Sequence, residues 1–206
     1  MNITKFDHSG FLLEKSGRGL LFDPVAYTHE LPEITNLDAI IITHLHGDHF
    51  SPQILEKIRA QNPDARVFTT SDNIANIPDA TAVKNGDEIE AGVFGLEFYG
   101  GNHAAIVSGE VPCENICTLV DGVFANSGGS FDLPPTSPEI LLVPITAPWL
   151  KIEESLNFIK AVKPKVVIPT HDALNSDLGN TICDNWLKKI CDEVGADYKN
   201  IHFGEI

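Results

Sequence analysis

The feature that most constrains this chain is a cluster of three histidines and an aspartate within six residues: His44, His46, Asp48 and His49. The cluster directly follows residues 38–43, a β-branched apolar run that predicts a strand buried on both faces. Loops just past strand ends carry functional groups in many α/β proteins. In an extended chain His44 and His46 point the same way, while Asp48 and His49 can turn back toward a second position. Imidazole and carboxylate bind zinc, iron and manganese, so the spacing predicts a metal site.

Further ligands must come from other strand ends, because one short loop offers too few donors for two metal ions. His103 and His171 each follow an apolar segment that predicts a strand, residues 98–102 and 166–170, and are candidate ligands. His8 lies between two predicted strands, where a pocket-lining role and an ordinary turn fit the sequence equally well. His29 and His202 lie in a polar loop and near the C-terminus, and we interpret both as structural.

Composition narrows the class of protein. The 206 residues carry 14 basic and 29 acidic side chains, a formal charge of −15 that disfavours binding to nucleic acid. No apolar run approaches the ~20 residues of a membrane span, and no signal peptide is recognisable. The four cysteines lack zinc-knuckle or redox spacing and are interpreted as reduced thiols. These features predict a cytoplasmic chain with one domain over residues 1–206, acting on a small molecule and on neither nucleic acid nor membrane.

The order of predicted elements argues for two sheets flanked by helices in that one domain. Ser51 and Pro52 are typical of a helix start, and Asn62 ends that helix. Amphipathic helices are expected at 153–162 and 181–194, the second with an apolar face of Ile182, Trp186, Ile190 and Val194. Strands are expected at 3–6, 11–15, 20–22, 38–43, 66–70, 139–144 and 165–169, with several antiparallel strands across 82–124 and a turn at Asp121-Gly122.

The sequence resembles the metallo-β-lactamase-fold superfamily, and within it the branch of L-ascorbate-6-phosphate lactonase and related small bacterial hydrolases. The shared segments are HSGFLLE at 8–14, LFDP at 21–24, HxHxDH at 44–49, NH at 102–103, SGGSF at 127–131 and IPTHD at 168–172. The HxHxDH motif is highly specific for the superfamily, whereas each other segment is weak alone. The resemblance implies a mixed α/β (α+β) fold, a four-layer αββα sandwich with metal ions at one edge between the sheets.

The resemblance also implies two sets of metal ligands. The first ion would be held by His44, His46 and His103, and the second by Asp48, His49 and His171. Asp23, at a strand-end Asp-Pro position, would orient a ligand histidine, as metal sites generally require. One or two divalent ions are expected, zinc foremost, with manganese and iron as alternatives.

One position departs from the family pattern. The pattern has an aspartate that bridges the two metals, and the matching residue here is Gly129. Glycine offers no ligand atom on a side chain, so one site is expected to be weaker, or its bridge replaced by water, an anion or a nearby carboxylate. Asp132 and Asp172 are the candidates for that carboxylate.

The predicted activity is metal-assisted hydrolysis of a small ester, lactone or phosphoester. Asp48 would orient the nucleophile as well as bind metal, and His8 or Asp172 would donate a proton to the leaving group. The alternative is a non-catalytic descendant of the fold that binds metal or senses a ligand, since the bridging carboxylate is missing. The sequence does not predict the oligomeric state. Trp149 is compatible with a position in a subunit interface and, at least equally, with packing near the cleft.

Overall fold

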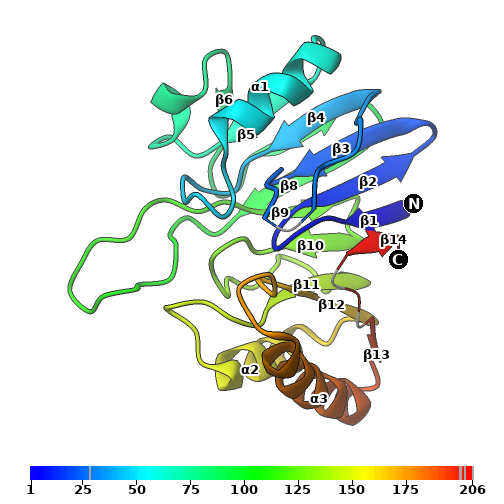
Figure 1. Cartoon of the computed structure of the whole chain (residues 1–206), viewed down its shortest axis with the longest axis vertical. Helices are drawn as coiled ribbons and strands as arrows, with labels where there is room; N and C mark the ends of the chain where they lie inside the picture. The colour runs from blue at the N-terminus through cyan, green and yellow to red at the C-terminus, as the bar shows by residue number, and fades with distance from the viewer. Residues whose placement is uncertain (28, 200, 202, 206) are drawn as a thin grey trace.

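Two seven-stranded sheets form the centre of the protein in the computed structural model, which describes residues 1–27, 29–199, 201 and 203–205 (Figure 1). The first sheet has the order β14-β1-β2-β3-β4-β5-β6, and the second has the order β13-β12-β11-β10-β9-β8-β7. The strands are β1 (Asn2–Lys5), β2 (Phe11–Lys15), β3 (Arg18–Phe22), β4 (Leu37–Ile41), β5 (Arg66–Thr69), β6 (Thr81–Ala82), β7 (Glu88–Ala91), β8 (Phe94–Tyr99), β9 (Cys117–Val120), β10 (Phe124–Asn126), β11 (Ile140–Pro144), β12 (Val166–Thr170), β13 (Asp197–Tyr198) and β14 (Gly204–Glu205).

Helices cover the outer faces of both sheets (Figure 1). Helix α1 (Pro52–Gln61) lies on the first sheet, and α2 (Ile152–Val162) and α3 (Asp177–Val194) lie on the second. A single 3₁₀ turn, Ile74–Asn76, follows β5. The four layers are therefore helix, sheet, sheet and helix, which confirms the predicted αββα sandwich.

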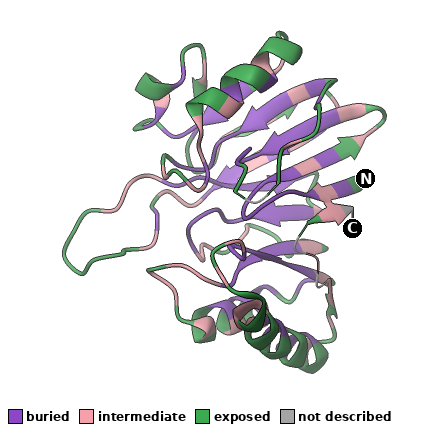
Figure 2. Ribbon diagram, in the orientation of Figure 1, coloured by how far each residue is buried: buried purple, intermediate pink, exposed green. Residues whose placement is uncertain are grey.

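Three apolar clusters hold the layers together, and the buried residues lie on the strands while the outer helix faces are exposed (Figure 2). The inter-sheet cluster is the largest and includes Phe11, Phe22, Phe68, Phe94, Phe98 and Phe124. The second cluster joins α2 and α3 to their sheet through Phe158, Ile159 and Leu187. The third joins α1 to its sheet through Leu55 and Ile58. Burial of these side chains, at about 25 cal/mol per Å² of apolar surface, is the main force that stacks the layers.

Local sequence signals correctly locate several boundaries. The hydroxyl of Ser51 accepts a hydrogen bond from the Ile54 amide, and α1 begins at Pro52 and ends before Asn62, as predicted. Asp121 and Gly122 both have positive φ, 51° and 68°, as the tight turn between antiparallel β9 and β10 requires.

The apolar face predicted for the last helix is wrong in part. Helix α3 starts at Asp177, four residues before the predicted start, with Ser176 as its cap. Ile182 and Trp186 are 52% and 47% exposed, whereas Leu187, Ile190 and Cys191 are buried against the second sheet. Residues spaced four apart rotate by about 40° per step around a helix. A line of residues spaced by four therefore turns away from the buried face of the helix within three repeats. The face of α3 that is buried contains residues spaced by both three and four.

No helix in the described part of the chain is long and apolar enough to cross a membrane. Cys113, Cys117, Cys183 and Cys191 are all described, and all four are free thiols. His202, which the sequence interpretation left as structural, lies outside the described residues.

Candidate metal centre

The His44–His49 segment leaves the carboxyl end of β4, a central strand with parallel neighbours on both sides. The amides of His49 and Phe50 both donate to the carbonyl of His46, at 2.9 Å each, which closes a turn inside the motif. This turn brings Asp48 and His49 back toward His44, as the sequence predicts. Gly47 has open space around its α-carbon, so the turn presents its side chains without crowding.

Three other connections bring histidines to the same edge. His103 follows β8, His171 follows β12, and His8 lies between β1 and β2. The potential ligand atoms form three groups, each with all its atoms within 4.8 Å of one another: His44, His46 and His103; His8, His49 and His171; and His44, Asp48 and His49. The six residues proposed as ligands from the resemblance thus lie together, and His8 joins them.

Hydrogen bonds behind the cluster determine which ring nitrogen of His44 and His49 is free. Asp23 is fully buried, and its Oδ2 accepts from Thr43 Oγ1 at 2.8 Å and from His49 Nδ1 at 2.7 Å. Because the single hydroxyl proton of Thr43 goes to Asp23, Thr43 Oγ1 must accept from His44 Nδ1, 3.0 Å away. His44 Nε2 then carries a lone pair, and it is buried without a hydrogen-bond partner among the described residues.

His103 is oriented in the same way by the backbone. Its Nδ1 donates to the carbonyl of Ala104 at 2.6 Å, which leaves the lone pair on Nε2. His49 Nε2, whose Nδ1 is held by Asp23, lies 3.0 Å from His171 Nε2. Ligand histidines in metal sites characteristically donate their other ring N–H to a carboxylate or carbonyl. These residues therefore fit a divalent metal, and Asp23 lies where the resemblance predicts it.

Burial favours the neutral form of four rings of this cluster, those of His44, His46, His103 and His171. Desolvation lowers the pKa of His44 and of His171 well below the ordinary value, and neighbouring histidines lower both further. Desolvation also lowers the pKa of the half-buried His46 and of the buried His103. A neutral imidazole has the lone pair that a metal ion needs, so the electrostatics of the metal-free site favour metal over protons.

Asp48 remains ionised in this environment. Burial by itself would raise the pKa of Asp48, but the hydrogen bond with His8 and the proximity of His49 lower the pKa overall. Asp48 Oδ2 lies 3.2 Å from His8 Nε2 and 3.8 Å from His49 Nε2. The carboxylate is therefore available as an anionic ligand or as a group that orients a nucleophile.

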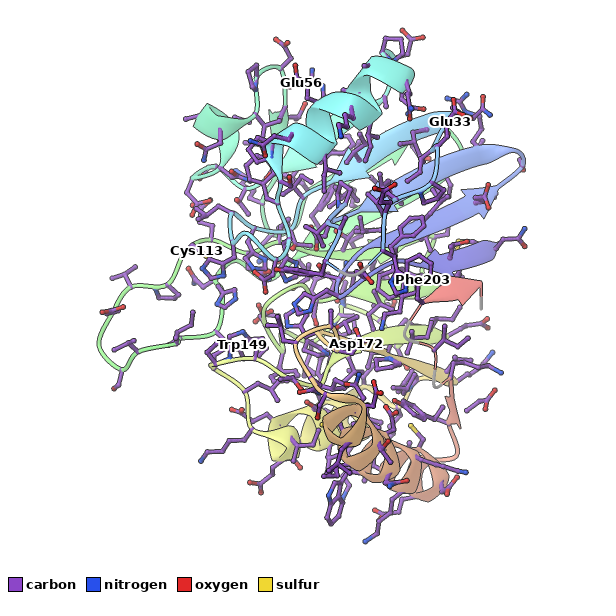
Figure 3. The ribbon with its side chains drawn as sticks, in the orientation of Figure 1. Glu33, Glu56, Cys113, Trp149, Asp172 and Phe203 are labelled. Carbon is purple, nitrogen blue, oxygen red and sulfur yellow. The ribbon has the colours of Figure 1, made fainter. Side chains whose placement is uncertain are left out.

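The contacts of Asp172 differ from those expected of a proton donor. Asp172 is 2% exposed, and its Oδ2 lies 2.8 Å from Nζ of Lys5, which is fully buried. A carboxylate paired with a buried ammonium accepts a hydrogen bond from it and stays ionised, so these contacts favour a structural role beside His171. Figure 3 shows Asp172 farther inside the molecule than Cys113 and Trp149. Among the described residues it belongs to no group with metal-ligand spacing.

Gly129 lies directly against the first set of histidines. A β-carbon at Gly129 would lie 2.2 Å from Cδ2 and 2.3 Å from Nε2 of His103, and 3.2 Å from Cε1 of His44. The ring of His103 therefore fills the space that a side chain would need. Asp132 does not replace the missing carboxylate: it accepts from Ser130 Oγ at 3.0 Å and, within the described residues, is in no candidate ligand group.

Aromatic side chains border the cluster. The ring of Trp149 lies 5.6 Å from that of His103 and 6.2 Å from that of His171, and Phe131 packs on its other side at 5.4 Å. Of the two interpretations of Trp149, these contacts favour packing near the cleft. His29, interpreted as structural, instead lies outside the cluster with Nδ1 2.8 Å from an oxygen of Asp7.

Comparison with known proteins identifies the family. The family model for the β-lactamase superfamily domain matches residues 2–171. The chain belongs to the β-lactamase superfamily. Protein Rv0786c of Mycobacterium tuberculosis is 34% identical over 181 residues, covering 84% of this chain and 85% of that protein. A UPF0173 metal-dependent hydrolase of Carboxydothermus hydrogenoformans is 27% identical over 197 residues, covering 83% of this chain and 84% of the relative.

The solved structures agree on the fold. Igni18, a metallo hydrolase from the archaeon Ignicoccus hospitalis, aligns with a TM-score of 0.73 at 22% identity, covering 100% of this chain and 97% of that one. The prediction of the superfamily is therefore confirmed, and the narrower lactonase branch stays a prediction.

Sequence reasoning missed three residues of this β-lactamase superfamily site. Thr43 relays the orientation of two histidines, and its place beside His44 at a strand end was the available signal. Lys5 shares the inward face of β1 with Ile3, so strand alternation could have indicated a buried lysine in need of a partner. Sγ of Cys113 lies 3.6 Å from Nε2 of His46, a contact that no local sequence pattern indicates.

Proposed function

We propose that this protein is a metal-dependent hydrolase that cleaves a small ester, lactone or phosphoester with an activated water molecule. The observation that carries the proposal is the orientation of His44 and His103. Each donates its Nδ1 proton to a fixed acceptor, leaving Nε2 lone pairs that converge with His46. Three neutral imidazoles that leave further positions open are the ligand set of catalytic rather than structural zinc sites. Relatives named metal-dependent hydrolases support the same reaction class.

A bound divalent ion would supply Lewis-acid activation of a water molecule and of the substrate oxygen. We propose zinc for this ion on the basis of the imidazole ligands, with one or two ions bound. Asp48 is 30% exposed and ionised, so it can both bind metal and accept a hydrogen bond from the attacking water. His8 is the group beside Asp48 from which a proton could reach the leaving group.

The border of the site favours an uncharged substrate group. Trp149 packs on the cluster, as does Tyr27, 5.5 Å from the ring of His8, and Phe131 packs on Trp149. The titratable groups that contribute to the pKa shifts of His44 and His171 are other histidines and, for His171, Asp48, rather than lysine or arginine. Phosphoester sites commonly add arginine or lysine to stabilise the anion. Within the proposed class we therefore favour lactones and carboxylic esters, in agreement with the resemblance to the lactonase branch.

We also propose a small-molecule partner and a cytoplasmic location for the protein. A formal charge of −15 supports a small-molecule partner over nucleic acid. Four free thiols support placement in the cytoplasm, where cysteines are kept reduced.

The test is hydrolysis by protein stripped of metal with a chelator and then reloaded with zinc or manganese, on a panel of lactones, carboxylic esters and phosphodiesters. We expect turnover to disappear on stripping and to return on reloading. The His44→Ala variant should lose activity, and His29→Ala, which removes a histidine outside the cluster, should retain it. Turnover that persists in the stripped protein would contradict the proposal.

The non-catalytic alternative rests on Gly129, where the family has a bridging carboxylate. It predicts that the protein binds metal with the same dependence on His44 but hydrolyses no member of the panel at any metal loading. Metal binding and hydrolysis are therefore measured on the same samples, so that the two functions give different results.

A further inference from the structure

His8 lies in a short loop that is hydrogen-bonded to the segments of Asp48 and His171, two of the candidate ligands of the second metal ion. The Ser9 hydroxyl donates to the backbone carbonyl of Asp48 at 2.9 Å, and the amide of His171 donates to the carbonyl of His8 at 3.1 Å. His8 itself is fully buried and has a φ of 60°, a left-handed conformation that is uncommon for residues other than glycine, although asparagine, aspartate and histidine adopt it more often than the rest. His171 has the same conformation, with a φ of 61°. Backbone strain of this kind, about 1–3 kcal/mol per residue, persists where the surrounding structure fixes it and is concentrated at functional sites.

Two of the three distances measured around His8 fall in the range expected between ligands of one ion, and the third is longer. Its Nε2 lies 3.2 Å from Asp48 Oδ2, and His49 Nε2 lies 3.8 Å from the same oxygen and 3.0 Å from His171 Nε2. Two ligand atoms at about 2.1 Å from one metal are separated by roughly 3.0–3.4 Å when the angle between the bonds is 90–109°. The rings of His8 and His171 are stacked at 4.6 Å with planes 10° apart.

A hydrogen bond to Asp48 alone explains the burial of His8 poorly. Its Nδ1 is buried with no hydrogen-bond partner among the described residues. An unpaired buried polar group costs about 1–3 kcal/mol, and one hydrogen bond contributes about as much in return. A metal bond to Nε2 would add a much larger stabilisation and would explain why the ring is enclosed at this point.

Without a carboxylate at position 129, the second ion would have fewer protein ligands, and His8 would supply one more. Position 129 has no side chain, and the ring of His103 occupies the adjacent space. Asp48, His49 and His171 would form a three-ligand set without a bridge, whereas His8 would raise it to four protein ligands. Four ligands complete a tetrahedral coordination sphere for zinc.

We propose that His8 is a ligand of the second metal ion, together with Asp48, His49 and His171. This inference rests on the metal centre of the proposed function. It excludes proton donation by His8 to the leaving group, because Nε2 cannot hold a metal ion and a transferable proton at once. The second site is then a three-histidine, one-carboxylate site that compensates for the glycine at position 129.

Metal content and spectroscopy test this assignment without relying on activity. Wild-type protein, His8→Ala and His8→Asn are saturated with zinc, desalted, and measured for zinc per chain; the same proteins are titrated with cobalt(II) and followed by visible absorption. Asparagine tolerates the left-handed backbone, so His8→Asn guards against simple misfolding. His171→Ala is the positive control, and His29→Ala removes a histidine outside the cluster.

We expect about two zinc ions per chain in wild type and in His29→Ala, and about one in both His8 variants and in His171→Ala. In the cobalt titration, the variants should lose the absorption change of the second equivalent and keep that of the first. Two tightly held zinc ions in the His8 variants would overturn the assignment, as would a wild-type protein that binds a single ion unaffected by His8. Reduced turnover with unchanged metal content would return His8 to proton donation. Loss of the second ion in a protein that hydrolyses nothing would instead contradict the proposed function and leave the assignment standing.

Discussion

The replacement Gly129→Ala is the smallest change that should disturb the metal centre. In the native structure the ring of His103 lies where the new methyl group would be, 2.2 Å from Cδ2 and 2.3 Å from Nε2. Ordinary contact begins at 3.4 Å, so the ring must move by 3.4 − 2.2, or about 1.2 Å. The ring has little freedom to do so, because its Nδ1 is bound to the Ala104 carbonyl and the Ala104 amide donates to Gly129 O at 2.9 Å.

The size of the effect follows from the precision that metal ligands require. Ligand distances in metal sites lie within about 0.2 Å of their usual values, so a shift of 1.2 Å removes His103 from the first ion. Removal of a residue that only orients a ligand lowers metal affinity roughly 10–100-fold, and loss of a ligand itself should lower metal affinity by at least the larger of these factors. We expect zinc affinity to fall about 100-fold, or ~2.7 kcal/mol. Overpacking should also destabilise the metal-free protein by about 1–3 kcal/mol.

Competition between the protein and a chromophoric chelator gives the zinc affinity, and thermal unfolding of the metal-free protein gives the stability. Gly101→Ala is a matched control, since Gly101 lies in the same loop as His103 and its β-carbon would meet nothing within 4 Å. That variant should bind zinc as wild type does. If Gly129→Ala also keeps wild-type affinity within about threefold, the ring of His103 does not occupy this space in solution and the reasoning fails. The same crowding implies that Gly129→Asp weakens the first ion instead of restoring a bridge.

Other changes test the groups behind the cluster. Asp23→Asn removes an acceptor of the His49 Nδ1 proton, and zinc affinity measured by chelator competition should fall roughly 10–100-fold; an unchanged affinity would show that Asp23 does not orient the ring. Lys5→Met removes the ammonium that pairs with the buried Asp172 and should lower the free energy of unfolding in urea by about 3–5 kcal/mol. The double variant Lys5→Met/Asp172→Leu should recover much of this loss. Equal losses in both proteins would contradict the prediction. The metal-free protein should lose stability below about pH 6.5, because burial lowers the pKa of His44 and its neighbours in the folded state and the unfolded chain then binds more protons. Urea unfolding of the metal-free protein at pH 7.5 and 5.5 measures this, and equal stability at the two values would refute it.

Local chemistry made part of the site predictable. The motif at 44–49 lies within one turn of chain, where spacing alone determines which side chains can meet. His103 and His171 were found because each follows an apolar strand, and loops just past strand ends often carry functional groups. The apolar face of α3 was misjudged because periodicity shows that a helix has a buried face but not which residues the sheet covers.

Contacts between distant segments could not be predicted in this way. The Lys5–Asp172 pair spans 167 residues of sequence. The stacking of His8 on His171 likewise joins the loop after β1 to the loop after β12, which lie in different sheets. Such pairs depend on how two sheets are stacked and on where loops cross between them, which no short window of sequence records.

The sequence by itself determined the candidate ligands, the strands that precede them and the glycine at position 129, because these depend on residue type and on interactions between near neighbours. Tertiary structure alone decided which side chains lie beside that glycine and beside the ligand motif. Packing of the sheets brings the ring of His103 against Gly129 and the ring of His8 against Asp48. Loops from both sheets meet at one edge, and there the nitrogens of separate histidines come within 4.8 Å of one another, close enough for a metal ion to join them.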